Sequence, residues 1–235
     1  MFDSPITSIK RDMFIRTTPE RVWKALTIAE ELNRWETQSA SIDLRIGGKV
    51  ELDYGWGVLT STTVKEFEVS KRLVLEEENG DLTIWTLEEV DGGTLVTLEY
   101  TGIWAGEDGF MMVEDMAFGT EQFFRNMKSV LEEDHDLRST FWTSWVGVRH
   151  HTHLGQGTQG SIVCGITEGT PACSIIQEGD IIVRVNERTV ESYNDFEEIV
   201  SMTPPGQSIA VTVHRDGEQH VLHVTTVPFG EKSPS

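Results

Sequence analysis

The sequence predicts an α+β fold for a chain of 235 residues, long enough for two domains. Between Ser41 and Thr101 apolar and polar residues roughly alternate between glycine-containing turns, as expected of an antiparallel sheet. From about Gly109 to Leu137 the apolar spacing becomes helical. Near residues 138–144 the pattern changes again, and short strand signals follow. We therefore expect a sheet that buries one face of a long helix, followed by a smaller strand-rich domain.

The first elements of the chain are expected to be a strand and two helices. The strand covers about Ser8–Thr17, and Thr18-Pro19-Glu20 has the hydroxyl cap, early proline and early acid of a helix start. Thr27 and Glu30 have the spacing of a capping box, which predicts a second short helix through Arg34.

The sheet and the closing helix follow from periodicity. Apolar residues at every second position predict strands that contain Val50, Leu52, Tyr54, Leu73, Leu75, Leu82, Ile84, Val96, Leu98 and Tyr100. Apolar residues three or four apart predict a helix whose buried stripe contains Met112, Met116, Phe123, Met127 and Leu131.

The second domain is predicted to be rich in strands. The candidate strands are Ser161–Thr167, Asp180–Asn186, Ser208–Arg215 and Gln219–Thr226, with a helix over about Asn194–Met202. Asp216-Gly217 predicts a tight hairpin, because the preferred turn needs positive φ at both central residues. We place the domains at residues 1–139 and 140–228, with a flexible tail over 229–235.

Charge and composition exclude several functional classes. Asp and Glu number 39 against 19 Lys and Arg, a net charge of −20 that would repel nucleic acid and anionic membranes. The sequence has no long apolar span and no secretory signal at Met1–Lys10, so a cytoplasmic location is expected. Cys164 and Cys173 lack a CxxC pattern and are expected to be free thiols.

A family resemblance rests on several segments of the first domain. They are residues 15–26 (IRTTPERVWKAL), Leu32–Trp35 (LNRW), Leu44–Lys49 (LRIGGK), Gly92–Leu98 (GGTLVTL) and the closing helix. Together they resemble the SRPBCC (START-like) superfamily, in the branch of homologues of the heat-shock protein 90 ATPase activator, over about residues 8–137. The resemblance implies a helix-grip fold: a curved seven-stranded antiparallel sheet around the long helix, with an apolar cavity between them.

An aromatic and thioether set is the candidate lining of that cavity. Its members are Trp35, Trp56, Trp85, Met112, Met116, Phe123 and Met127. Methionine and aromatic surfaces adapt to varied apolar ligands, but the same residues could instead simply fill the core. No pair of titratable residues has the spacing of a catalytic acid and base, so no catalytic residue is assigned.

The second domain resembles a PDZ domain of the type found beside bacterial HtrA proteases, over about residues 141–228. The segments that carry this resemblance are Trp145–Val148 (WVGV), 165–172 (GITEGTPA) and 178–186 (EGDIIVRVN), with Val190. Two departures are Cys173–Ile176, which is one residue short, and Asn186-Glu187 in place of Asn-Gly. Asparagine tolerates left-handed dihedral angles, so the second departure is mild.

The PDZ resemblance implies a peptide-binding site. The Trp145–Val148 turn would offer backbone amides to a peptide's C-terminal carboxylate, beside a strand edge that pairs with an extended peptide. The expected peptide-binding residues are Trp145, Val146, Gly147, Val148, Phe196, Ile199 and Val200. The segment 150–160 is an unusual insertion beside this presumed groove.

Two motifs in that insertion point to cofactors, and both are set aside. Residues 155–160 read GxGxxG but precede a strand and open no helix, so a dinucleotide site is not expected. His150, His151 and His153 could coordinate a metal, yet exposed loop histidines without cysteines usually remain unligated. We assign no metal and no cofactor.

These observations predict a non-enzymatic binding protein with two modules, acting as an adaptor or carrier. Its partners would be a hydrophobic small molecule and a protein C-terminus or extended peptide. One alternative is a cyclase- or hydrolase-type enzyme that uses Glu99, Glu114 or Tyr100 for proton transfer in the cavity. A second alternative, stimulation of an Hsp90-type ATPase, follows only from the branch name.

Overall fold

A computed structural model describes residues 4–232, which form two units: one contains residues 4–109 and 115–138, and the other contains residues 110–114 and 139–232. We call them the N-terminal unit and the C-terminal unit. Each has its own sheet and its own apolar core.

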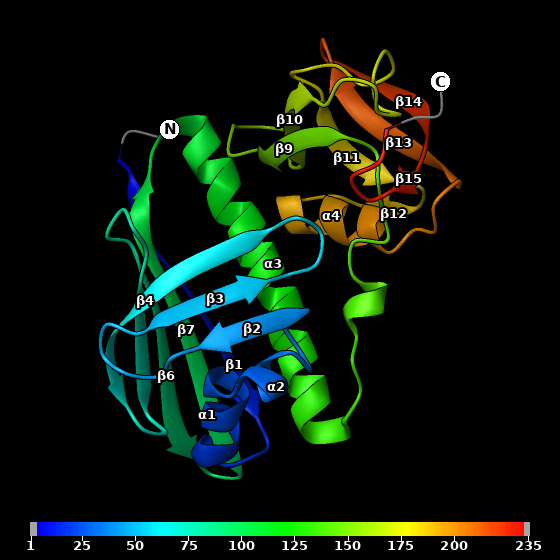
Figure 1. The fold of residues 1–235 in the computed structure, drawn as a ribbon. Coiled ribbons are helices and arrows are strands. Elements are labelled where there is room, and N and C mark those ends of the chain that lie inside the picture. Colours follow the sequence, from blue (N-terminus) through cyan, green and yellow to red (C-terminus); the bar gives the residue numbers. More distant parts are fainter. Residues whose placement is uncertain (1–3, 233–235) are drawn as a thin grey trace. The chain divides into compact units, whose positions relative to one another are not determined.

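The N-terminal unit is a seven-stranded antiparallel sheet with one long helix packed on it (Figure 1). The sheet order is β1-β7-β6-β5-β4-β3-β2. The strands are β1 (Ile6–Ile15), β2 (Ser39–Ile42), β3 (Lys49–Asp53), β4 (Leu59–Glu68), β5 (Arg72–Glu76), β6 (Leu82–Val90) and β7 (Gly93–Trp104). The helices are α1 (Pro19–Thr27), α2 (Ala29–Leu32) and α3 (Gly106–Glu133). The predicted meander and closing helix are confirmed.

The two short helices begin differently from each other. Thr18 caps α1 as predicted, because its side chain accepts a hydrogen bond from the Arg21 amide. The predicted capping box at Thr27 is wrong: Ile28 is the N-cap of α2, and the Thr27 hydroxyl donates instead to the Trp23 carbonyl at 2.7 Å. A hydroxyl at the end of one helix can bond back into that helix, which leaves none for the next.

Helix α3 buries its apolar stripe against the sheet. Phe124, Met127 and Val130 share one core with Trp85 and Leu98 of β6 and β7. The helix ends at Glu133, earlier than predicted, because Asp134 adopts a left-handed conformation with φ 57°.

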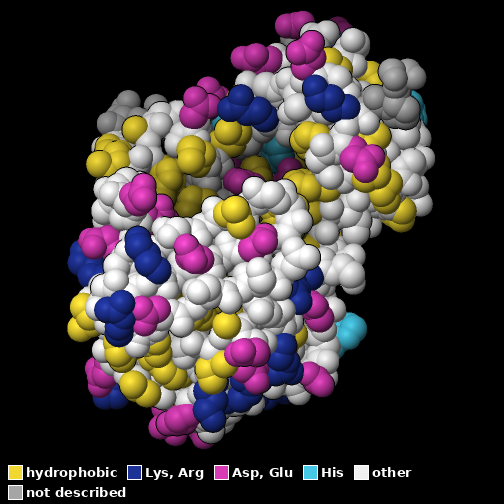
Figure 2. Space-filling model, viewed as in Figure 1, with side chains coloured by type: hydrophobic (Ala, Val, Ile, Leu, Met, Phe, Trp, Pro, Cys, Tyr) yellow, Lys and Arg dark blue, Asp and Glu magenta, His cyan; other side chains and the backbone are white. Residues whose placement is uncertain are grey.

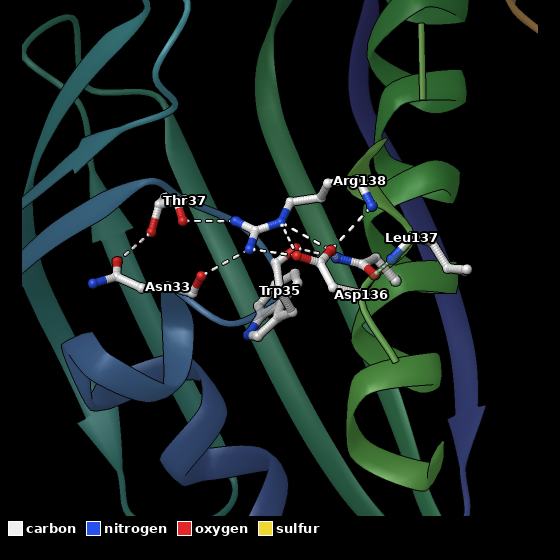
Figure 3. Close-up of polar contacts among 7 residues, drawn as sticks. Asn33, Trp35, Thr37, Asp136, Leu137 and Arg138 are labelled. Atoms are coloured by element: carbon white, nitrogen blue, oxygen red, sulfur yellow. Dashed lines mark hydrogen bonds and ion pairs between the residues drawn. The ribbon is translucent and has the colours of Figure 1, made fainter. Parts of the chain in front are cut away.

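A polar network holds the chain after α3 against the segment that follows α2 (Figure 3). Buried Asn126 donates to the Trp35 carbonyl at 2.6 Å and accepts from the Leu137 amide at 2.6 Å. Arg138 donates to the carbonyls of Thr37 and Asn33, at 2.7 and 3.0 Å, and pairs with Asp136. These bonds satisfy backbone groups that no helix or strand uses.

The C-terminal unit is a second antiparallel sheet with one main helix. Its strands are β8 (Ser144–Trp145), β9 (Val148–Thr152), β10 (Ser161–Ile166), β11 (Ile181–Val185), β12 (Arg188–Thr189), β13 (Ser208–Arg215), β14 (Glu218–Thr225) and β15 (Val227–Pro228). Helix α4 covers Tyr193–Ser201, and a 3-10 turn covers Arg138–Thr140. The main path is β14-β13-β11-β10-β9, with β12 on β11, and β15 pairs with β8.

Local turn chemistry explains much of this unit. Asp216 and Gly217 both have positive φ, 52° and 84°, and join β13 to β14 as the predicted hairpin. Asn186 has φ 51°, the left-handed conformation that asparagine tolerates. The segment that the sequence suggested as an insertion is largely a hairpin, because β9 pairs with β10 and leaves residues 153–160 as its loop.

The start of the predicted tail is held by aromatic contacts. The Phe229 ring lies 5.7 Å from the Trp145 ring and 6.4 Å from the Trp142 ring, and Trp145 Nε1 donates to the Glu231 carbonyl at 2.8 Å. Residues 233–235 lie outside the described residues.

The surface reflects the acidic composition. On the face drawn in Figure 2, basic side chains are scattered among acidic ones. Within residues 4–232, no helix has the length and apolarity to cross a membrane. In the same range, no three or more His, Cys, Asp or Glu side chains are grouped as a metal site would need.

Candidate binding sites in the two units

The predicted cavity residues of the N-terminal unit fall into three groups. Trp35, Trp85 and Met127 are buried in the core, where the Trp35 and Trp85 rings meet edge-on at 6.3 Å. Met116 and Phe123 are half-buried. Trp56 and Met112 are exposed, at 58% and 51% of their surface. Ligand contact by this set stays a prediction, and the half-buried members are the ones placed to provide it.

A polar cluster that the sequence did not reveal lies between the sheet and α3. The Tyr54 hydroxyl donates to Glu36 Oε1 at 3.1 Å, and the Thr120 hydroxyl lies 3.4 Å from the Tyr100 hydroxyl. Glu36 follows α2, Tyr54 follows β3, Tyr100 is on β7 and Thr120 is on α3. Four separate elements therefore bring hydroxyl and carboxyl groups together.

Burial shifts the pKa values of this cluster. It raises the pKa of Glu36 to about 7, although the hydrogen bond from Tyr54 opposes the rise. Burial also raises the pKa of Tyr100 to about 12, and the Glu36 charge adds to that rise. The pKa of Tyr54 is raised by burial first, and then by Glu36. The influence of Glu36 on both tyrosines indicates that the three groups share one site.

Two aromatic rings lie near the Tyr54 ring of this pair. The Tyr54 ring lies 5.7 Å from the Trp56 ring and 6.0 Å from the Phe123 ring, two members of the predicted cavity set. Glu36, Tyr54, Tyr100 and Phe123 are all half-buried, so each keeps part of its surface accessible.

An open hollow of about 400 Å³ runs along β2, β3 and β4 near this cluster. Its lining includes Thr60, a neighbour of Tyr54 that opposes the rise of the Tyr54 pKa. The cluster therefore lies close to an edge of the sheet that solvent reaches.

The proton-transfer residues considered from the sequence do not assemble around one point. Glu99 lies next to Tyr100 on β7, so the two side chains point to opposite faces of the sheet, and Glu99 accepts from the Ser8 hydroxyl. Glu114 is half-buried on α3. Tyr100 alone belongs to the cluster, while Glu36 and Tyr54 were missed. The inward alternation of Val50, Leu52 and Tyr54 was the available signal for Tyr54; Glu36 had none.

The carboxylate-loop candidate of the C-terminal unit is the turn between β8 and β9. The carbonyls of Val146 and Gly147 accept hydrogen bonds from Ala172 and Thr167, at 3.0 and 2.8 Å. Within the part of the chain that the structure describes, the amides of Val146 and Gly147 donate to no acceptor. The turn thus uses its carbonyls internally and leaves two neighbouring amides for another acceptor.

Gly147 is required by this geometry. Its φ of +85° is unfavourable for other residues, and an added Cβ would lie 2.0 Å from Thr170 Oγ1. The close packing of the Thr170 side chain against Gly147 holds the turn in place.

Strand β9 and helix α4 contact each other beside the turn. β9 ends the described sheet path, so one of its edges has no strand partner. Of the predicted pocket residues, Val146, Phe196, Ile199 and Val200 are buried in the unit's core, whereas Trp145 and Val148 are half-buried. Their contact with a peptide stays a prediction.

The His150 side chain links β9 to α4 and to β10, which the sequence analysis did not anticipate. Its Nε2 lies 2.8 Å from Glu197 Oε1 on α4, and its Nδ1 lies 2.6 Å from Ser161 Oγ on β10. The Tyr193 ring stacks on it at 4.5 Å. His151 and His153 each use Nδ1 on a backbone carbonyl, at 2.8 and 2.7 Å. These histidines therefore serve structural contacts in the hairpin.

Comparison with known proteins agrees with this division. Residues 16–132 match the family of Activator of Hsp90 ATPase homolog 1-like proteins, and residues 134–226 match the PDZ domain family. The magnetosome formation protease MamE of Magnetospirillum gryphiswaldense is 30% identical over 89 residues. That match covers 37% of this chain and only 11% of MamE.

Solved structures are similar to the N-terminal part of the chain. Protein SSP2350 from Staphylococcus saprophyticus superposes with a TM-score of 0.50 at 17% identity, over 54% of this chain and 93% of that chain. The Aha1 dimer from Colwellia psychrerythraea gives a TM-score of 0.48 at 21% identity, over 55% and 98% of the two chains. Residues 16–132 thus belong to the family of Activator of Hsp90 ATPase homolog 1-like proteins, and residues 134–226 belong to the PDZ domain family.

Proposed function

We propose that this protein is a two-module binding protein, an adaptor or carrier. In this proposal the PDZ domain captures the C-terminus of a protein, and the helix-grip domain holds a small molecule with an apolar body. Domains of these two kinds support a binding role.

The observation that carries the peptide-binding half is the pair of amides at Val146 and Gly147. A terminal carboxylate has two oxygens that accept hydrogen bonds, and neighbouring amides in a turn form an anion site of matching size. The edge of β9 that has no strand partner offers the backbone pairing that an extended peptide needs.

A peptide panel tests this half directly. Fluorescein-labelled hexapeptides ending in Val, Leu or Ile, each as free acid and as C-terminal amide, are titrated against the full chain by fluorescence anisotropy. We expect the free acids to bind at least about tenfold more tightly than the amides, because charge-assisted hydrogen bonds to the carboxylate are lost on amidation. Equal affinity for the two forms contradicts the assignment of the turn.

A glycine pair provides the matched variants. Gly147→Ala should abolish binding, because its Cβ meets Thr170, whereas Gly157→Ala in the 153–160 loop has no atom within 4 Å of its Cβ. Both glycines have positive φ, 85° and 104°, so both variants carry backbone strain, and only Gly147→Ala adds the clash with Thr170. If Gly157→Ala loses binding equally, strain rather than the turn's shape is responsible.

The small-molecule half is supported by the half-buried Phe123 and Tyr54 and by the nearby hollow at β2–β4. Apolar contacts contribute about 25 cal/mol per Å² buried, so a modest ligand body can bind without a charged anchor. Native mass spectrometry of the freshly purified chain is the test: we expect a bound small molecule that gentle activation removes. A spectrum of bare protein only, together with no uptake of 1-octanol, contradicts this half.

One observation favours a second function, small-molecule catalysis. A carboxyl with a pKa of about 7 is suited to general acid–base work at neutral pH, and Glu36 has that pKa beside two tyrosine hydroxyls. Glu36 thereby replaces Glu99 and Glu114 as the candidate group. Hydrolysis of a panel of p-nitrophenyl esters that disappears in Glu36→Gln supports this function; hydrolysis at an unchanged rate in the variant removes Glu36 from it.

A further inference from the structure

The Glu36 carboxyl lacks the partner that buried carboxylates normally have. Tyr54 supplies one hydrogen bond, and no Lys, Arg or His among residues 4–232 forms an ion pair with Glu36. Arg138, which bonds to the adjacent Thr37 carbonyl, is already paired with Asp136 at 2.7 Å. A carboxylate removed from water without a cation is costly, so the site is incomplete when Glu36 is ionised.

We propose that the helix-grip site takes a ligand with an amine or quaternary ammonium group beside an apolar chain, and that Glu36 is its counter-ion. This inference rests on the proposed small-molecule function and specifies the ligand class of that same site.

The aromatic residues support a cationic head group. Tyr54 bonds to Glu36, and its ring neighbours Trp56 at 5.7 Å and Phe123 at 6.0 Å. Electron-rich ring faces attract cations, and quaternary ammonium groups are commonly held by such rings. The half-buried Met116 and Phe123 on α3 provide apolar surface for the rest of the ligand.

Charge disfavours an anionic ligand at this site. An anionic ligand would lie beside an acidic side chain with no cation to offset it. A neutral ligand can bind while Glu36 stays protonated, so it gives no charge-dependent signal.

The titratable groups facing Glu36 are Tyr54, after β3, and Tyr100, on β7. The Glu77 charge also raises the pKa of Tyr100. Both tyrosines stay protonated near pH 7, so Glu36 alone titrates there.

The test compares two probes of equal chain length on the full-length protein. Octyltrimethylammonium carries the cation and 1-octanol does not, and binding of each is measured by isothermal titration calorimetry at pH 6 and pH 8. With the pKa of Glu36 at about 7, its ionised fraction rises about tenfold over this interval. We expect octyltrimethylammonium to bind about tenfold more tightly at pH 8, and 1-octanol to bind equally at both pH values.

Two variants assign the effect. Glu36→Gln should abolish the pH dependence for octyltrimethylammonium and weaken its binding at pH 8 about tenfold, while 1-octanol binding is retained. Glu88→Gln, an exposed glutamate on β6, is the matched control and should behave as wild type. Thermal unfolding of each variant verifies that it is folded.

The outcomes separate the two proposals. If 1-octanol binds but the cation shows no preference and no pH dependence in the wild-type protein, the ammonium assignment is overturned and the cavity proposal stands. If neither probe binds, both proposals are overturned. The wild-type pH comparison needs no variant, so the inference stays testable even if Glu36→Gln does not fold.

Discussion

Asp180 of the PDZ domain and Glu36 of the helix-grip domain are both carboxyls removed from water, but only Asp180 has a cation beside it. The Asp180 side chain is 1% exposed and accepts from Arg215 Nε and Nη2, at 2.6 and 2.7 Å, and from the Gln177 amide at 2.9 Å. Glu36 has the Tyr54 hydroxyl and no cation among the described residues.

The difference separates a structural carboxyl from one available to a ligand. Three donors, two of them charged, satisfy Asp180, so its carboxylate serves the fold. Glu36 makes a single bond and keeps accessible surface, so the fold tolerates it without being stabilised by its charge. Stability measurements should therefore respond in opposite directions when the two groups are neutralised.

The largest expected effect is at Asp180. Asp180→Asn leaves Arg215 without its counter-ion and should lower the free energy of unfolding by about 3 kcal/mol, because breaking a buried pair strands a charge. Urea denaturation of the variant and of Glu178→Gln, a neighbouring exposed site, provides the measurement and the control. A loss equal to that of the control would show that the pair is not structural.

Glu36→Gln should change the free energy of unfolding in the opposite direction and stabilise the protein. The pKa of Glu36 is raised from 4.5 to about 7 in the folded protein, so its folded state binds the proton more tightly than its unfolded state does. The stability that this pKa difference contributes is fully present below pH 4.5 and is lost as pH rises through about 7. At pH 8 the variant should be more stable by about 2 kcal/mol, and at pH 4 equal to wild type. A variant that is less stable at pH 8 contradicts an unpartnered carboxylate.

Glu132, in the same domain as Glu36, sharpens the contrast in pH dependence. Burial alone would raise its pKa, but hydrogen bonds from the Arg16 amide and guanidinium, with the Lys128 charge, lower it below 4.5. Its stabilisation is therefore present above pH 4.5 and is lost as pH falls. Glu132→Gln should cost about 1 kcal/mol at pH 7 and nothing near pH 3, with exposed Glu133→Gln as control. A pH-independent cost would point to packing instead.

The smallest effect is expected at Tyr54. Tyr54→Phe removes the hydrogen bond that lowers the pKa of Glu36, so that pKa should rise further, with a change in stability below about 1 kcal/mol. Carbon-13 NMR titration of the labelled glutamate carboxyls measures it. Tyr100→Phe keeps the Tyr54 bond and should leave the Glu36 titration closer to wild type; equal shifts in the two variants would refute the specific role of Tyr54.

The fold was predictable where its signals are local. The alternation of the sheet, the i+3 and i+4 spacing of α3 and the Asp216-Gly217 turn each depend on residues near one another in the sequence. The start of α2 was not predictable, because the Thr27 hydroxyl could either accept from an amide of the next helix or donate to the Trp23 carbonyl, and sequence spacing does not rank these two bonds. β9 was missed as well: two of its five residues are histidines, which obscures the apolar alternation of a strand.

The sites were predictable only in part. The WVGV turn could be named as a candidate because such a turn needs a particular glycine at a particular place, which a sequence records; its contact with a peptide stays a prediction. The Glu36–Tyr54–Tyr100 cluster was not, since its members are 18 and 46 positions apart and come from different elements.

The sequence by itself determined the α+β class, the sheet and closing helix of the first domain and the two family resemblances, because these depend on local periodicity and short motifs. Only the tertiary structure decided which carboxyl is removed from water and what lies beside it. That depends on side chains from β3, β7, α3 and the segment after α2 meeting in space, and a pKa is set by those neighbours.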